Sequence, residues 1–107
     1  MLARVTLIVA LLGLNAPLFA AGDPEAGGRK SAPCQACHGA DGNGTAPQFP
    51  RLAGQYPDYL VQALTDYRNG NRKNAIMQPF AANLSPQDIE DLAAYFSTLP
   101  DGLYKRP

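Results

Sequence analysis

The residues best suited to chemistry lie in one string, Cys34–His38, which reads Cys-Gln-Ala-Cys-His. One helical turn would place the two thiols, three positions apart, on the same side of the backbone. There they can add to the two vinyl groups of one porphyrin edge, and His38, the next residue, can reach the iron from one face. C-x-x-C-H is typical of covalent haem attachment. The string therefore predicts one haem c bonded to Cys34 and Cys37.

Three other interpretations of this string stay open. A thioredoxin-like dithiol is expected near a βαβ unit, and the chain offers neither strands nor length for one. A plain disulfide would suit an oxidising compartment. A zinc site needs about four ligands, whereas the string holds the only two cysteines and the only histidine of the chain.

The second axial ligand of such a haem cannot be another histidine, because His38 is the only one. Apart from Met1, the only thioether belongs to Met77. No helical periodicity surrounds Met77, so we expect it in a loop. A thioether is a soft ligand, and His/Met coordination raises the reduction potential of the iron. With both axial positions filled, the iron has no open site for substrate, which predicts transfer of one electron rather than an enzyme.

The first twenty residues have the features of a secretory signal peptide. Arg4 is their only charge, Val5–Leu14 is apolar, and small residues surround Ala20. This order is typical of a cleaved signal. An uncleaved anchor is the alternative, but a membrane-spanning helix needs about 20 apolar residues. We therefore predict a signal peptide over 1–20, a single domain over 21–107, a periplasmic location and no stable membrane span after cleavage.

Charge and size restrict the function of the remaining domain. Loss of Arg4 would leave 8 of the 9 basic side chains against 9 acidic ones, a net charge of −1. This balance does not indicate binding to nucleic acid or to an anionic membrane. With ten Gly and ten Pro in the whole chain, so short a domain usually needs a disulfide, metal or cofactor to complete its core.

The pattern of apolar residues predicts an all-α fold. One helical stretch begins at Asp23 and runs weakly toward Cys34, a second follows Pro57 and stops at 69–70, and a third runs from Ser85 to Leu99. The third begins with Ser-Pro-Gln-Asp, which is close to a capping box. Residues 39–56 and 70–84 are expected to be loops, and no segment alternates as a strand would.

Taken in order, these motifs resemble the class I cytochromes c, especially small bacterial single-haem proteins and the individual domains of dihaem relatives. The resemblance covers essentially the whole domain. It is carried by Gly27, Cys34–Gly39, Asp41–Gly44, Pro50–Gln55, Tyr59–Leu60, Gly70–Arg72, Met77–Ala81 and Ala94–Phe96. It implies the cytochrome c fold, with three main helices and long loops wrapped around one haem, and a cytochrome c domain over 21–107.

The resemblance also implies roles for particular residues. Cys34 and Cys37 would bond the haem, and His38 and Met77 would ligate its iron. The carbonyl of Pro50 would accept a hydrogen bond from the ligand imidazole, a contact that fixes the orientation of the ring. Leu52 would press on the haem face. Arg72 would pair with a haem propionate, or would be a solvated loop charge.

Two features concern the crossing of the N- and C-terminal helices. Gly27 and the pair Tyr95–Phe96 resemble the residues at which the N- and C-terminal helices of the family cross. At such a crossing, a missing side chain lets the two helices approach closely. Lys30 departs from the pattern, because relatives often place an apolar residue four before the first cysteine. Gly28 would weaken this helix by roughly 1 kcal/mol relative to Ala. We therefore expect a first helix that is shorter or more mobile than in relatives.

The predicted function is electron transfer between larger redox proteins, as a shuttle or as a subunit of a redox complex. Donor and acceptor would dock transiently at the haem edge, around Gln35, Ala36, Gly39 and Met77. A basic cluster of Arg68, Arg72 and Lys73 would either steer an acidic partner or be a solvated helix end. The alternative function is a haem-based sensor or small haem enzyme in which the Met ligand is displaceable.

Overall fold

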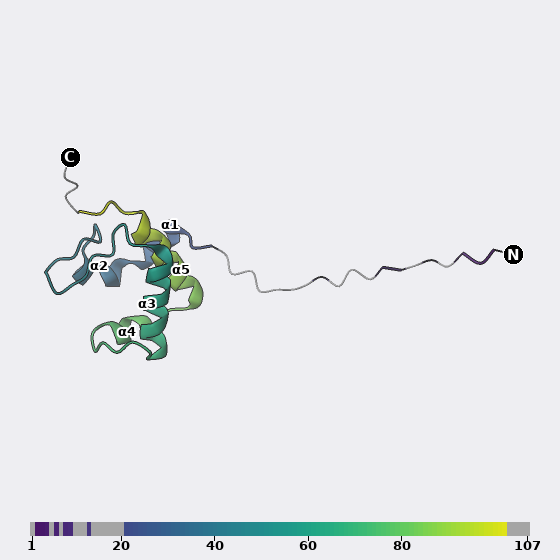
Figure 1. Ribbon diagram of the computed structural model, residues 1–107. Coiled ribbons are helices and arrows are strands. Elements are labelled where there is room, and N and C mark those ends of the chain that lie inside the picture. The colour runs from purple at the N-terminus through teal and green to yellow at the C-terminus, as the bar shows by residue number, and fades with distance from the viewer. Residues whose placement is uncertain (1, 5, 7, 10–12, 14–20, 103–107) are drawn as a thin grey trace.

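The structure, a computed structural model, describes residues 21–102 without a gap and, before them, only 2–4, 6, 8, 9 and 13. Most of the predicted signal peptide and the tail 103–107 thus lie outside the described residues. The described chain is all-α, as predicted, and contains no strand (Figure 1). Its helices are α1 (Pro24–Lys30), α2 (Ala32–His38), α3 (Pro57–Asn69), α4 (Met77–Ala82) and α5 (Pro86–Thr98).

The first helical stretch is not continuous, because it breaks at Ser31 into α1 and α2. The break has a local cause in Pro33, which has no N–H to donate to the carbonyl of Arg29 and is tolerated only in the first turn of a helix. The fully buried Ser31 bridges the two helices, since its hydroxyl donates to the carbonyl of Gly28 in α1 and accepts from the side-chain amide of Gln35 in α2. The break lets α2 carry the Cys-Cys-His string in a direction of its own.

The helices α3 and α5 form where they were predicted. At the start of α5, the Ser85 hydroxyl accepts from the Asp88 N–H at 3.0 Å, and the Asp88 carboxylate accepts from the Ser85 N–H at 2.9 Å. The expected capping box is confirmed. Leu92 and Phe96 of α5 pack with Leu60 of α3 as the centre of the core.

The helix α1 crosses α5 closely at Gly27. A Cβ at this position would overlap the backbone carbonyl of Asp91 and lie 2.7 Å from the Cβ of Tyr95. Lys30 is held here by charge, because its ammonium lies 2.6 Å from the carboxylate of Asp91 and 2.8 Å from that of Asp88. The departure at Lys30 therefore replaces an apolar contact with an ion pair, and α1 reaches α5 in spite of it.

The segment expected to be a loop over 70–84 contains one more helix, and Met77 is its first residue. The expectation of a loop at Met77 was wrong. Asn74 begins this helix, since its side-chain oxygen accepts from the N–H groups of Ile76 at 2.9 Å and Met77 at 3.0 Å. The helix has only six residues, too few for a periodic pattern. Figure 1 shows α4 beside the C-terminal end of α3, which it contacts.

Across the described residues, no helix combines the length and apolar character that a membrane crossing requires.

Candidate haem-binding site

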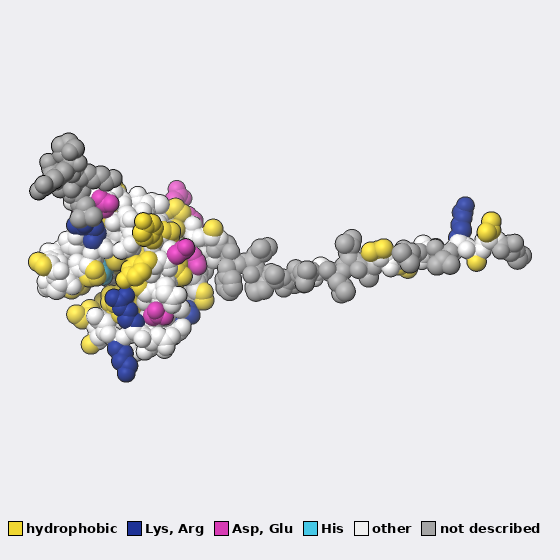
Figure 2. All heavy atoms as spheres, in the orientation of Figure 1, with side chains coloured by type: hydrophobic (Ala, Val, Ile, Leu, Met, Phe, Trp, Pro, Cys, Tyr) yellow, Lys and Arg dark blue, Asp and Glu magenta, His cyan; other side chains and the backbone are white. Residues whose placement is uncertain are grey.

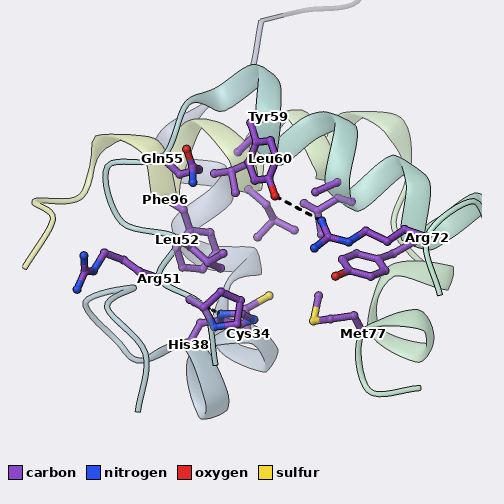
Figure 3. Close-up of a pocket in the computed structure, with 16 residues that line it drawn as sticks. Cys34, His38, Arg51, Leu52, Gln55, Tyr59, Leu60, Arg72, Met77 and Phe96 are labelled. Atoms are coloured by element: carbon purple, nitrogen blue, oxygen red, sulfur yellow. Dashed lines mark hydrogen bonds between the residues drawn. The ribbon is translucent and has the colours of Figure 1, made fainter. Parts of the chain in front are cut away.

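Two adjoining hollows between α2, α3 and α4 form one cavity, and both are lined by Cys34, His38, Pro50, Tyr67 and Met77. Figure 3 shows His38 and Met77 on opposite sides of this cavity, with the Met77 sulfur pointing across it toward the imidazole. The two predicted axial ligands, which come from different helices, therefore face one another.

The imidazole of His38 is fixed by its second nitrogen. Its Nδ1 lies 2.7 Å from the carbonyl oxygen of Pro50, and the side chain is 5% exposed. Because a carbonyl oxygen can only accept, Nδ1 carries the proton and donates it, which leaves the lone pair of Nε2 free to bind a metal. The N–H groups of Leu52 and Ala53 donate to the carbonyl of Gly42 at 2.7 and 3.0 Å. These bonds hold the backbone that follows Pro50 against the loop that contains Gly42.

The two thiols lie on successive turns of α2, where Cys34 and Cys37 are both free and half-buried. Burial raises the pKa of the Cys34 thiol because a thiolate is poorly stabilised away from water. Both cysteines line the same hollow as His38 and Met77. The structure thus brings the whole predicted set of ligands and attachment residues to one cavity.

Leu52 and Arg72 also line the cavity. The Arg72 guanidinium stacks over the Tyr67 ring, with its carbon 4.8 Å from the ring centroid, and donates to the Tyr59 hydroxyl at 3.5 Å. The bond to Tyr59 is the largest cause of a raised pKa at Arg72. Figure 3 shows Arg72 joined to Tyr59 by a dashed line, with its guanidinium directed toward the cavity. The structure places this charge on the wall of the site.

Several lining residues were not anticipated as part of a site. One face of α3 lines the cavity, and its residues recur at helical spacing: Tyr59, Leu60, Ala63, Leu64 and Tyr67. The sequence did contain a signal for this wall of the cavity, namely a helix face that carries two tyrosines among aliphatic residues. Asn74, which holds the N–H of Met77, was missed because the helix that it begins was missed.

Arg51 was also missed. It lines the cavity, and its Nε is, among the described residues, the one buried side-chain nitrogen or oxygen without a hydrogen-bond partner. A buried N–H normally has a partner, so this atom favours an anionic or polar group nearby.

A sequence model of the family described as Cytochrome c matches residues 26–100. The chain belongs to the cytochrome c family. Its cofactor is covalently bound haem c.

The relatives of this cytochrome c support the same assignment. Cytochrome c4 of Pseudomonas aeruginosa is 51% identical over 87 residues, which are 81% of this chain and 43% of that protein. Cytochrome c-554(548) of Halomonas halodenitrificans is 49% identical over 81 residues, 73% of this chain and 98% of that protein.

Among solved structures, reduced recombinant cytochrome c4 from Pseudomonas stutzeri superimposes with a TM-score of 0.75 at 47% identity, covering 78% of this chain and 48% of the other. The cytochrome c fold is therefore confirmed. The chain spans a little under half the length of the cytochrome c4 relatives that it matches.

The residues of the cavity fit a haem. An imidazole and a thioether face each other, two thiols lie at one edge, and aliphatic and aromatic side chains form the walls. None of the described residues that line the cavity is acidic, and two are arginines, Arg51 and Arg72. This distribution of charge suits a flat apolar ring that carries carboxylates.

Proposed function

We propose that this cytochrome c is an exported one-electron carrier in which His38 and Met77 ligate the iron and Cys34 and Cys37 bond the ring. The arrangement of His38 and Met77 across the cavity carries the proposal. When bound, haem c supplies an iron that gains and loses one electron. The chain supplies the ligands, the orientation of the ring and a dry environment.

Each proposed residue has a physical task. The Pro50 carbonyl holds the Nδ1 proton of His38 at 2.7 Å, which fixes the ring and makes Nε2 a stronger ligand. The neutral thioether of Met77 favours the reduced iron and so raises the potential. Leu52 would press on the ring, and Arg72, held between Tyr59 and Tyr67, would pair with a propionate.

The same ligand set favours electron transfer over catalysis. Two strong axial ligands would leave no coordination position for a substrate, and we assign no catalytic residue. The proposed partners are larger redox proteins, a donor and an acceptor, that dock at the haem edge through small transient interfaces. The protein would act in the periplasm, after removal of residues 1–20, as a free shuttle or as the cytochrome subunit of a complex.

Expression of the full chain together with the haem-attachment machinery tests this proposal. The mass of the purified protein should equal residues 21–107 plus one haem, and its pyridine haemochrome spectrum should show two thioether bonds. The oxidised protein should be low-spin, with a methionine-to-iron charge-transfer band, and the reduced protein should not bind carbon monoxide readily. A colourless protein with the mass of its bare polypeptide would contradict the proposal. A high-spin iron that binds carbon monoxide would instead favour the sensor.

A further inference from the structure

The chain contains two Asn-Gly pairs, Asn43-Gly44 and Asn69-Gly70. In such a pair the glycine nitrogen can attack the side-chain amide carbon of the asparagine, because glycine has no side chain to hinder the approach. A carbon–nitrogen bond forms to give a cyclic imide, the bond to the amide nitrogen breaks, and ammonia leaves. Water then opens the ring and leaves a carboxylate in place of the amide. The two pairs offer the same chemistry in different surroundings.

The pair at Asn43 is held in place on both sides of the reacting bond. The side-chain amide of Asn43 donates to the carbonyl of Pro100 at 3.4 Å, and its oxygen accepts from the N–H of Gly102 at 2.6 Å. The attacking nitrogen is also engaged, since the N–H of Gly44 donates to the carbonyl of His38 at 2.7 Å. Both groups would have to release these partners before they could meet, which requires local opening of the loop.

The pair at Asn69 is open. Asn69 is the exposed last residue of α3, and its side chain forms no hydrogen bond with any described residue. The N–H of Gly70 donates to the carbonyl of Tyr67 at 3.4 Å, a long bond at a helix end, where the backbone frays. A Cβ built on Gly70 would meet nothing within 4 Å. Fraying of one residue is therefore enough to let the nitrogen reach the amide carbon.

Charge also favours reaction at Asn69. Ring closure places a negative charge first on the glycine nitrogen and then on the oxygen of the attacked amide, and nearby cations stabilise that charge. Gly70 lies within the basic cluster, of which Arg68 and Arg72 are held by contacts with Leu84 and Tyr67. Figure 2 shows Lys and Arg side chains, in dark blue, at the lower end of the domain, where Figure 1 places the C-terminal end of α3.

The charge beside Asn43 has the opposite sign. The carboxylate of Asp41 accepts from the backbone N–H of Asn43 at 3.0 Å. This bond is the largest cause of a lowered pKa at Asp41, so the carboxylate stays ionised at neutral pH. A fixed negative charge next to Asn43 opposes the negative charge that ring closure would create.

We propose that Asn69 is a self-modification site, at which the folded protein converts its own amide to a carboxylate while Asn43 is preserved. The products are aspartate and isoaspartate. Either one puts a negative charge at the C-terminal end of α3, where the helix dipole disfavours it. The turn affected is the one in which the N–H of Arg72 donates to the carbonyl of Asp66 at 3.1 Å. The inference goes beyond the proposed electron transfer and does not depend on which residues ligate the iron.

Peptide mass spectrometry of the aged, haem-loaded protein tests the inference. During incubation in neutral buffer, the peptide that contains Asn69 should gain about one dalton. Part of the product should be isoaspartate, which is detected by enzymatic methylation of its free carboxylate. Asn43 should react at least about tenfold more slowly, because its loop must open first. Both rates should rise with pH, since the attacking nitrogen must lose its proton.

Two variants and one condition sharpen the test. Asn69→Gln should abolish the gain in mass at this position, because glutamine would have to close a larger, less favoured ring. Asn71→Gln is the matched control, since Asn71 is exposed in the same turn but precedes an arginine instead of a glycine, and it should leave the modification of Asn69 unchanged. In guanidinium chloride the two Asn-Gly pairs should react at similar rates, because the fold no longer separates them.

The outcomes that contradict the inference are equally direct. Asn69 that stays intact in the folded protein while it reacts in guanidinium chloride would overturn it, as would equal rates at Asn69 and Asn43 in the folded protein. The methionine-to-iron band is followed in the same samples to verify that the protein stays folded and loaded. A parent protein that never shows this band contradicts the proposed function alone, because the modification is measured from the mass of a peptide.

Discussion

Two regions of the molecule differ in how far the chain's own side chains complete them. One is the crossing of α1 and α5, and the other is the cavity beside α3 and α4. At the crossing, backbone approaches backbone at Gly27, and Asp91, although 3% exposed, has its carboxylate matched by Lys30, Gln87 and the N–H of Asp23. At the cavity, two thiols, an imidazole and a thioether line space that no side chain fills. The polypeptide alone completes the first region, and we propose that the haem completes the second.

This comparison explains why so small a domain can be stable. The crossing joins the two ends of the domain, but a domain of this length buries too little apolar surface to fold on the strength of one crossing. A haem bound to the folded state would stabilise that state alone. The bound haem would therefore serve folding as well as the proposed electron transfer.

The largest effect is expected from removing the cofactor. A Cys34→Ser/Cys37→Ser chain should lack covalent haem and show no cooperative thermal transition by circular dichroism, because the walls of the cavity have nothing to pack against. Any residual protection from hydrogen exchange should lie in α1 and α5. A cooperative transition in this haem-free chain would show that the cavity is also complete without its cofactor.

The next effect is expected at the crossing itself. Gly27→Ala should lower the free energy of unfolding of the holoprotein by about 3 kcal/mol, since the new methyl overlaps the carbonyl of Asp91. Gly28→Ala is the matched control, because its methyl meets only the edge of the Tyr95 ring at 3.2 Å and gains about 1 kcal/mol in helix propensity. Denaturant unfolding measures both. If both variants lost the same free energy of unfolding, the close approach of the two helices at Gly27 would have no special role.

A change at Met77 should affect the cavity and spare the crossing. Met77→Ala should open the iron to carbon monoxide and lower the reduction potential by at least about 60 mV, a tenfold change in the one-electron equilibrium. Potentiometric titration and absorption spectra measure this change, and hydrogen exchange in α1 and α5 should stay near that of the parent. A potential and spectrum like those of the parent would show that Met77 is not the ligand.

The smallest effect concerns the buried carboxylate of the crossing. Hydrogen bonds from the Asp23 N–H and from Lys30 lower the pKa of Asp91 from 3.8 to about 2. Because the pKa is lower in the folded than in the unfolded chain, Asp91 stabilises the fold above pH 4, and this contribution is lost as the pH falls toward 2. Relative to Asp91→Asn, the parent should gain about 1 kcal/mol between pH 3 and pH 5. A difference in unfolding free energy that stays constant over this range would contradict the assignment.

Sequence patterns were most informative where the signal is local. The cap and periodic face of α5 and the glycine-ended α3 form as expected, because capping and amphipathic spacing act within a few residues. The break at Ser31 was missed although its cause, Pro33, is local, because the weak helical pattern of residues 24–34 was extended across it. The helix α4 was missed because a six-residue helix depends on Asn74 and on its contact with α3.

The sequence by itself determined the chemistry of the site, since C-x-x-C-H, a single histidine and a single internal methionine leave few choices for attachment and ligation. Only the tertiary structure decided that Met77 begins a helix facing His38 and that Arg72 is held between two tyrosines. It also decided that the large apolar side chains of Ile76 and Phe80 stay exposed. The physical reason is that ligand identity is a property of single side chains, whereas facing, stacking and exposure depend on how helices far apart in the chain pack.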